Sequence, residues 1–415
     1  FSSIIGYTGP ISESEYTALH KKNKDYTQND TVGKAGLEQY YETYLRGKNG
    51  EQKFYIDNVG RISEIISSTD SVAGDDLYLS IDADLQKATY LALQNEIAAI
   101  VYSNIKSGEI PINDVYTALI GNSVINTEHF SKAKASDTEK NVLSVFKSRQ
   151  KTTLGKIKQE LTSSPEALNT MSDEVLDEFT YIISMLKDDQ VLLKNEIDTS
   201  DSVYQKWKNQ KISPKEYLSY CITQHWIDIS QLNVDEKYAD STEVYDALCK
   251  YILKNIKTDT EFSKIIYQYM ITRGEISPRQ LCLILFDQGV LDYDDATVNK
   301  LKNGSLSPRD FLMKKIYNIE ITPAQLALEP CTGSCVVTDE KTGEIRAMVS
   351  YPGYDSNKLA NGVDSEYFAS LQHDKSSPLL NYATQQKTAP GSTFKLVSAT
   401  AGLAENVITT SDQIR

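Results

Sequence analysis

Two residues near the C-terminal end of the sequence, Ser392 and Lys395, have the types and spacing of a serine nucleophile and its base. They belong to the run Pro390-Gly391-Ser392-Thr393-Phe394-Lys395 and are one helical turn apart, so both side chains reach the same face of a helix. Burial lowers the pKa of a lysine, which would let Lys395 accept the serine proton. A helix N-terminus at the serine would stabilise the negative charge that develops there. Ser392 is therefore a candidate covalent nucleophile, with Lys395 as its base.

Spacing alone does not single out this pair. The same Ser-x-x-Lys spacing begins at five other serines: Ser103, Ser131, Ser144, Ser148 and Ser184. Those five lie in charged, helix-periodic stretches, where a serine and a lysine one turn apart form an ordinary solvated face. Ser392 differs because Pro390-Gly391 permits a tight turn before it, and residues 394–404 are apolar on most sides, which predicts a buried helix. A second interpretation stays open, in which Ser392 caps a helix and Lys395 extends into solvent.

The first hundred residues predict short, mixed elements. Ser12-Glu13-Ser14-Glu15 reads as a capped helix start, and residues 33–50 as a glycine-bounded turn–helix–turn unit. Three runs have the composition or the alternation of short strands: 54–56, 61–66 and 77–81. Asp82 can cap a helix that runs from Leu85 to about Tyr102.

The pattern then changes twice. From about 105 to 317 the apolar periodicity is helical, so we expect an all-α stretch. Four of its helices share a hydroxyl cap followed by proline: Ser213-Pro214, Ser277-Pro278, Ser307-Pro308 and Thr322-Pro323. Their unequal intervals indicate shared capping chemistry and not a solenoid. Residues 334–339 and 344–350 then predict a β-hairpin with Gly343 in its turn, followed by a polar loop of about 35 residues.

Composition excludes several classes of protein. The 415 residues carry 57 acidic and 43 basic side chains, a net charge of −14, which disfavours a polyphosphate partner and therefore nucleic acid. No run of about 18 apolar residues is present, so nothing in the sequence predicts a membrane span. The five cysteines are expected to be buried thiols, although Cys331 and Cys335 are near enough for a disulfide or half a metal site. The four histidines are isolated, so we predict no structural metal.

Several of these stretches together resemble one family. PGSTFK at 390–395 looks like the nucleophile motif of penicillin-binding proteins, whose Ser-x-x-Lys works with a later Ser-x-Asn and a Lys-Thr-Gly strand. Residues 33–50 resemble the pedestal of class B enzymes of the penicillin-binding protein 2 type. Residues 76–86 (DLYLSIDADLQ) are similar to the start of their transpeptidase domain, and 339–354 (DEKTGEIRAMVSYPGY) to its first strands. Pro378-Leu379-Leu380-Asn381 is similar to the approach to the serine.

The resemblance implies an α+β fold and a division of the chain. The implied parts are a pedestal or dimerisation-type domain (1–75), the start of a transpeptidase domain (76–104) and its continuation (318–415). Residues 105–317 lie outside the family pattern and are expected to be a helical insertion between the opening helix and the first hairpin. Tyr382 also departs from the pattern, because the family often has arginine there.

The resemblance also implies a function. Ser392 would attack the carbonyl before the terminal D-alanine of a peptidoglycan stem peptide, and Lys395 would act as general base. β-Lactams would acylate the same serine, and no cofactor is implied. The expected partner is a membrane glycosyltransferase of the shape–elongation–division–sporulation class. The expected location is the extracytoplasmic face of the cell membrane, reached through an anchor upstream of Phe1.

The sequence is also compatible with other interpretations, and it contains a misleading motif match. A class D β-lactamase or a β-lactam sensor also carries STFK, and a non-catalytic cell-wall scaffold is a further alternative. Lys341-Thr342-Gly343 spells a family motif, but it precedes Ser392 and lies in the predicted hairpin turn. Because Ser-x-Asn occurs nowhere in the sequence, we expect this chain alone not to turn over substrate.

Overall fold

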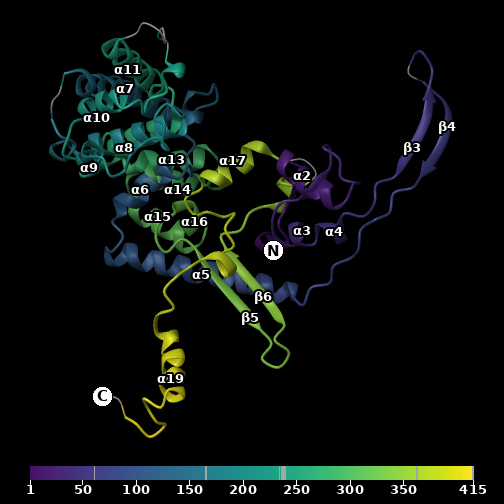
Figure 1. Cartoon of the computed structure of the whole chain (residues 1–415). Helices are drawn as coiled ribbons and strands as arrows, with labels where there is room; N and C mark the ends of the chain where they lie inside the picture. Colours follow the sequence, from purple (N-terminus) through teal and green to yellow (C-terminus); the bar gives the residue numbers. More distant parts are fainter. Residues whose placement is uncertain (60, 164–165, 233, 235–239, 361–362, 414–415) are drawn as a thin grey trace. The chain divides into compact units, whose positions relative to one another are not determined.

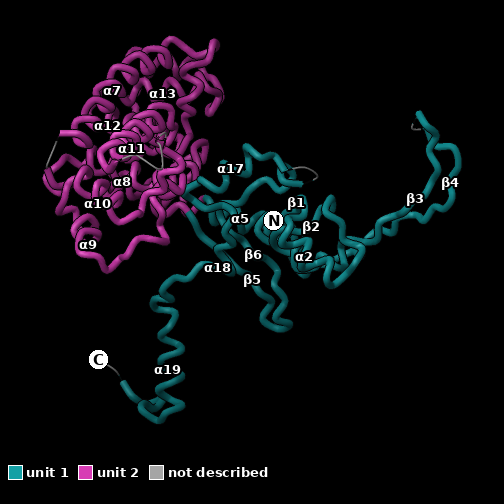
Figure 2. Tube along the Cα trace, turned by 45° about the horizontal axis from the view of Figure 1, so that its top comes forward, with its two compact units in different colours: residues 1–94, 332–415 teal, residues 95–331 magenta. Residues whose placement is uncertain are grey.

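The chain forms two compact units, coloured separately in Figure 2. A computed structural model describes residues 1–59, 61–163, 166–232, 234, 240–360 and 363–413. One unit consists of residues 1–94 and 332–415, and the other of residues 95–331.

The N-terminal part of the first unit is a small α/β cluster. Its elements are α1 (Ser2–Ile5), β1 (Thr8–Pro10), α2 (Glu13–Lys22), β2 (Thr31–Gly33), α3 (Gly36–Tyr40) and α4 (Glu42–Leu45). Ser12 caps α2 with a reciprocal Ser12–Glu15 capping box, which confirms the predicted helix start. β1 and β2 pair antiparallel, and the Arg46 guanidinium lies 3.7 Å from the centre of the buried Tyr26 ring.

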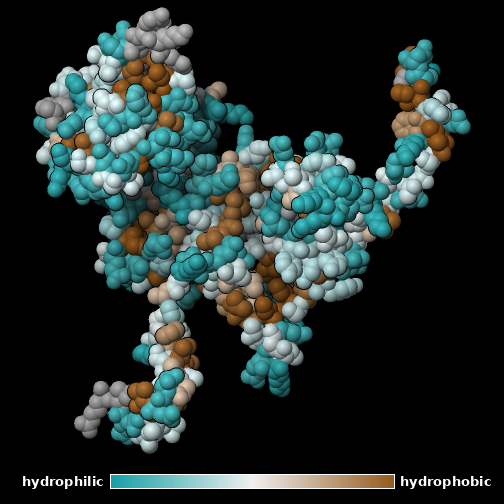
Figure 3. Space-filling view, viewed as in Figure 1, coloured by the Kyte–Doolittle hydropathy of each residue, from teal (hydrophilic) through white to brown (hydrophobic). Residues whose placement is uncertain are grey.

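The next two strands form an exposed hairpin. β3 (Glu51–Ile56) and β4 (Ile62–Thr69) pair antiparallel, as predicted, and every residue of both strands is exposed. Figure 3 shows apolar side chains along this hairpin. Phe54, Ile62 and Ile65 are among its exposed large hydrophobic residues.

The strand predicted at Leu77–Ile81 is wrong. This segment forms no strand, and Tyr78 is 90% exposed. A strand needs a continuous backbone ladder, but here only the Ser80 hydroxyl and the Asp82 N–H reach β6, through the carbonyls of Ile345 and Arg346. Asp82 nevertheless caps the following helix α5 (Ala83–Ser107), accepting the Leu85 N–H at 2.9 Å, as predicted.

The second half of this unit begins with the expected hairpin. β5 (Gly333–Thr338) and β6 (Ile345–Tyr351) pair antiparallel, and Gly343 closes the turn with φ of +77°. The Gln86 side chain of α5 bonds both backbone groups of Met348, at 2.6 and 2.7 Å. The predicted polar loop contains short helices as well: the 3-10 turn Ser356–Lys358, α17 (Ser365–His373) and α18 (Tyr382–Gln385).

The second unit is helical, as expected for 105–317 (Figure 1). Besides the end of α5 its α-helices are α6 (Ile112–Gly121), α7 (Asp137–Thr162), α8 (Asp173–Asp188), α9 (Ser202–Lys208), α10 (Pro214–Thr223), α11 (Ser241–Ile256), α12 (Thr260–Thr272), α13 (Pro278–Asp287), α14 (Asp295–Asn303), α15 (Pro308–Tyr317) and α16 (Pro323–Leu326). Its 3-10 turns are Thr127–Ser131, Leu168–Thr170 and Ile229–Gln231. All four predicted hydroxyl-proline starts are N-caps with proline in the first turn.

Helices of this unit also end alike. Among the described residues of this unit, the second residue after the helix has a left-handed backbone in seven places: Ser123, Gln190, Gln210, His225, Gly274, Gly289 and Ile319. Two residues further on, a buried aliphatic side chain enters the core: Ile125, Leu192, Ile212, Ile227, Ile276, Leu291 and Ile321. The left-handed residue turns the chain back toward the helix it has just left, so short connections suffice between neighbouring helices.

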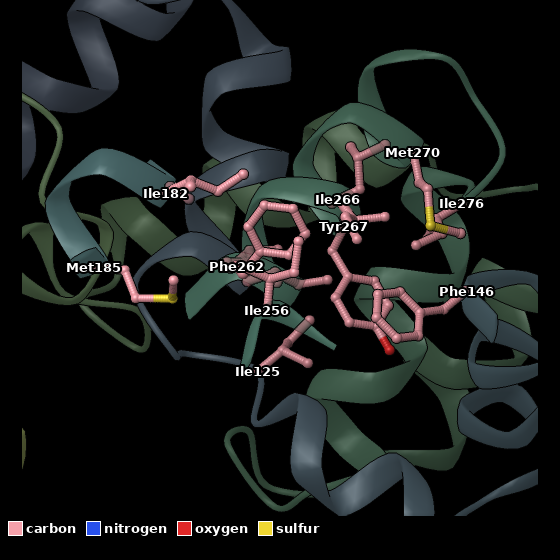
Figure 4. Packing of buried hydrophobic residues seen from close by; sticks show 14 of the residues in the cluster. Ile125, Phe146, Ile182, Met185, Ile256, Phe262, Ile266, Tyr267, Met270 and Ile276 are labelled. Carbon is pink, nitrogen blue, oxygen red and sulfur yellow. The ribbon is translucent and has the colours of Figure 1, made fainter. Parts of the chain in front are cut away.

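The core of the helical unit is aromatic and aliphatic. Tyr267 of α12 stacks on Phe146 of α7, with ring centres 4.1 Å apart and planes at 13° (Figure 4). Phe130 meets the same tyrosine edge-on at 5.8 Å. Cys221, Cys249 and Cys282 are buried in this unit, as expected for structural thiols, and burial raises the pKa of each.

One ionisable group in the helical unit is buried at an energetic cost. Glu178 of α8 is 2% exposed, and burial together with the neighbouring Glu174 raises its pKa to about 8. Lys156, Arg273 and Arg149 oppose this shift without cancelling it. Folding therefore favours the neutral carboxyl of Glu178.

We expect Glu178→Gln to remove a pH dependence of stability. The pKa of Glu178 is near 8 in the folded protein and has its ordinary value when unfolded. The free energy of unfolding of the wild-type protein therefore falls as pH rises from about 4.5 to 8. The glutamine variant should match wild type near pH 5 and exceed it at pH 8 by a few kcal/mol, on the order of the linkage expected for such a shift. Urea unfolding followed by tryptophan fluorescence measures this, because both tryptophans, Trp207 and Trp226, belong to the helical unit.

Exposed Glu109→Gln is the matched control and should leave the pH profile unchanged. Parallel profiles for wild type and Glu178→Gln would contradict the assignment.

The left-handed residues after the helices predict opposite effects of two substitutions on the free energy of unfolding. Gln190 has φ of +59° and is exposed, whereas Gly289 has φ of +69° and nothing within 4 Å of the position of an added Cβ. Gly289→Gln should lower the free energy of unfolding by about 1 kcal/mol through backbone strain alone. Gln190→Gly should raise it by roughly 0.5 kcal/mol, because glycine relieves the strain but also gains freedom when unfolded. The same fluorescence measurement tests both, and a loss at Gln190→Gly would refute the strain argument.

Candidate active site

The Ser392–Lys395 pair lies where a 3-10 turn runs into a helix. The turn Gly391–Phe394 is followed directly by α19 (Lys395–Ala404). The Lys395 N–H donates to the Ser392 carbonyl, and the Thr393 hydroxyl donates to the Pro390 carbonyl. Gly391 has φ of +59° with open space around it, so its role is the left-handed turn that starts the motif. The local structure thus has the serine at the entrance of the helix, as the sequence predicts.

The expected burial of this helix is not observed. No residue of α19 is buried, Leu396 is 77% and Val397 54% exposed, and Ser392 and Lys395 are exposed as well. Apolar composition leads to burial only where another apolar surface covers it, and no described residue provides that cover. The low-dielectric surroundings expected for Lys395 are therefore not present in this structure.

Ser392 and Lys395 lie within one turn of each other, but their side chains do not interact directly. No hydrogen bond links the Ser392 hydroxyl to the Lys395 ammonium within residues 363–413, all of which are described. Their roles as nucleophile and base remain predictions.

The approach to the motif is tied to the hairpin. The Ser350 hydroxyl of β6 donates to the Leu380 carbonyl at 3.2 Å and accepts the Tyr382 N–H at 2.9 Å. The Asn381 side chain accepts the Ala383 N–H at 3.1 Å and so caps α18. The Tyr382 hydroxyl donates to the Ser376 carbonyl at 2.7 Å.

The Lys341-Thr342-Gly343 decoy is a structural turn, as predicted. Asp339 accepts the backbone N–H groups of Lys341 and Thr342 at 2.8 and 3.0 Å, and these bonds lower the pKa of the Asp339 carboxyl. The three residues therefore close the β5–β6 hairpin and present no strand edge to a substrate.

A cavity of about 960 Å³ in the same unit was not anticipated from the sequence. It lies between the N-terminal residues, the start of α5 and the end of β6, with Tyr90 and Tyr354 in its wall. The Tyr354 hydroxyl donates to the Ser2 carbonyl at 3.0 Å, and burial raises its pKa to about 12. The lining comes from four separate segments, the fourth contributing Tyr367 of α17, so no local pattern could reveal it, and it contains neither Ser392 nor Lys395.

Comparison with known proteins identifies both ends of the chain. The family model described as "Penicillin-binding Protein dimerisation domain" matches residues 1–79. The model described as "Penicillin binding protein transpeptidase domain" matches residues 333–415, which include the Ser392–Lys395 motif.

Curated relatives agree with these matches. The chain is 32% identical over 109 residues to the peptidoglycan D,D-transpeptidase MrdA of Salmonella typhimurium, covering 26% of this chain and 18% of the relative. It is 30% identical over 109 residues to MrdA of Escherichia coli, covering 26% of this chain and 17% of the relative. It is 44% identical over 77 residues to the peptidoglycan D,D-transpeptidase PbpA of Mycolicibacterium smegmatis, covering 18% of this chain and 16% of the relative.

The matched part of the chain thus spans less than a fifth of the length of each of these relatives. The fold is α+β, as the transpeptidase match and the mixture of helices with small sheets show. Residues 1–79 and 333–415 are thus similar to the dimerisation and transpeptidase domains of penicillin-binding proteins.

Proposed function

We propose that this chain is part of a peptidoglycan D,D-transpeptidase of the penicillin-binding protein 2 type. The observation that carries the proposal is the match of residues 333–415 to the transpeptidase domain, with Ser-x-x-Lys at the entrance of α19. Three relatives bearing the name peptidoglycan D,D-transpeptidase support it. The match of residues 1–79 to the dimerisation domain weighs against a simple β-lactamase.

The proposed reaction is acyl transfer in two steps. Lys395 takes the proton of Ser392, whose Oγ attacks the carbonyl before the terminal D-alanine of a stem peptide. The Ser392 backbone N–H stabilises the tetrahedral oxyanion in part. When the oxyanion collapses, Lys395 gives its proton to the leaving amine, which expels D-alanine and leaves an acyl-serine. An amine of a neighbouring stem then attacks the acyl-serine, forms the cross-link and restores the Ser392 hydroxyl. No cofactor takes part.

The local geometry supports these roles. The 3-10 turn places the serine directly before the first turn of α19, where unpaired backbone N–H groups favour developing negative charge. The spacing keeps Lys395 one turn from the serine. Because α19 is exposed, we propose that reactivity requires its burial against further parts of a transpeptidase domain, including Ser-x-Asn and Lys-Thr-Gly motifs. We expect the 415-residue chain alone not to turn over substrate.

We also propose a domain organisation for the chain. Residues 1–75 are a pedestal, 76–104 and 318–415 belong to the transpeptidase domain, and 105–317 are an insertion between its opening helix and first hairpin. No described helix is long and apolar enough to cross a membrane. An N-terminal anchor, action outside the cytoplasmic membrane, and a glycosyltransferase partner of the shape–elongation–division–sporulation class are further parts of this proposal.

We expect benzylpenicillin to leave one covalent adduct on Ser392 of the gene product that carries a whole transpeptidase domain. The strained β-lactam carbonyl replaces the D-alanyl carbonyl in the attack. Intact-mass measurement and peptide mapping detect the adduct. Ser392→Ala should abolish it, whereas Ser398→Ala, six residues further along the chain in α19, should keep it.

An adduct that persists in Ser392→Ala would refute the nucleophile assignment. Rapid hydrolysis of penicillin by wild type would favour a β-lactamase, and complete inertness would favour a scaffold.

Lys395→Ala should slow acylation of Ser392 by about 10²-fold or more, the range expected for loss of a general base. The rate of adduct formation is measured by intact-mass spectrometry of samples quenched at timed intervals, and thermal unfolding checks that the variant is folded. Lys387→Ala, a nearby lysine before the motif, is the control and should acylate at the wild-type rate. Equal rates for wild type and Lys395→Ala would exclude the proposed base.

A further inference from the structure

One helix of the helical unit has a charge pattern opposite to that of the whole chain. Between Lys140 and Gln159, α7 carries six basic residues and no acidic one, in a chain with 57 acidic and 43 basic residues. Helix α7 is labelled in Figure 1 and belongs to the unit that is magenta in Figure 2. The role of this pattern is independent of the function proposed above.

Four of the six form a straight row, which we call the α7 lysine row: Lys140, Lys147, Lys151 and Lys158. Their spacings of 7, 4 and 7 residues place them within about 40° of one another around the helix and along roughly 27 Å of its length. All four are exposed, and none is in an ion pair with a described residue.

The other two basic residues of α7 have structural partners. Arg149 pairs with Glu275, and Lys156 is one of the charges that act on buried Glu178. The α7 lysine row therefore stands apart from the charges that hold the unit together.

On one side of the α7 lysine row the exposed residues are small, two serines and a glycine. Ser144, Ser148 and Gly155 are exposed on one side of the lysines, while α7 enters the core through Phe146 and Ile157, about 100–120° away around the helix. Ammonium groups only donate hydrogen bonds, and serine hydroxyls can donate as well. Such a surface is complementary to a ligand that carries only acceptors and negative charge.

We propose that the α7 lysine row binds a linear phosphodiester polymer that carries no bases. A row one side chain wide and about 27 Å long matches a thin chain of repeated negative charges lying along the helix. The net charge of −14 does not prevent this, because charges beyond about 8 Å are largely screened at physiological salt.

Three other partners fit the surface less well. Single-stranded nucleic acid binds to exposed aromatic side chains, and α7 has none outside its core. Helices that lie on a bilayer insert an apolar face, but the apolar face of α7 is already packed in the unit. A protein interface would need buried aromatic or aliphatic anchors, which the row lacks.

The experiment compares binding of the full chain to two probes. Poly(glycerol phosphate) tests the polymer, and vesicles with 30% phosphatidylglycerol, which present the same phosphodiester on a bilayer, test a membrane surface. The test variant changes all four lysines of the row to glutamine. The control variant changes four other exposed lysines of the same unit to glutamine: Lys206, Lys208, Lys300 and Lys302. Tryptophan fluorescence confirms that both variants remain folded.

Wild type should bind the polymer with an affinity that falls as salt rises. The row variant should lose about tenfold or more in affinity and show a weaker salt dependence, whereas the control should stay within about threefold of wild type. Equal losses in both variants, or no binding by wild type, would overturn the proposal. Binding to vesicles that is as tight as binding to the polymer, and equally dependent on the row, would instead assign the surface to a bilayer.

Discussion

The first unit depends on one side-chain amide that takes the place of a β-strand. Gln86, 3% exposed, bonds both the N–H and the carbonyl of Met348 on the edge of β6 that β5 leaves open. The two residues are 262 positions apart in the chain, so the contact closes a very long loop. Loop-closure entropy grows only slowly with length, and the intervening residues fold into a compact unit of their own. A large helical segment can therefore stand between Gln86 and Met348 without preventing this contact.

The helical unit is built from a repeated local rule and not from a repeated sequence. A hydroxyl and a proline begin the helix, a left-handed residue follows its end, and an aliphatic residue two positions later enters the core. The start could be predicted, because serine before proline has a specific capping role at Ser213 and Ser277. The left-handed turn after the helix could not be predicted, because its position is occupied by glycine in some turns but by Gln190 or Ile319 in others. Tertiary packing imposes that conformation on residues that do not prefer it.

The same distinction separates what the sequence predicts correctly from what it does not. Elements specified by neighbours in the chain agree with the structure: the capping box at Ser12, the Asp82 cap of α5 and the Gly343 hairpin turn. The alternating run at Leu77–Ile81 fails, because alternation describes a surface suited to a sheet and cannot supply the missing backbone ladder. The large cavity escapes sequence analysis for the related reason that its walls come from four separate segments.

The candidate active site shows this limit most clearly. The turn at Gly391 and the start of α19 place Ser392 and Lys395 by local rules alone, whereas the chemistry proposed for them depends on surroundings that no local rule specifies. A serine and a lysine in water are an ordinary polar pair, since solvent stabilises the charged amine and competes for the hydroxyl. The exposed apolar side chains of α19, Leu396 and Val397 among them, are what would drive the helix under a covering surface. Because the same residues would bury Lys395 as they dock, assembly of the domain and activation of the nucleophile become one event.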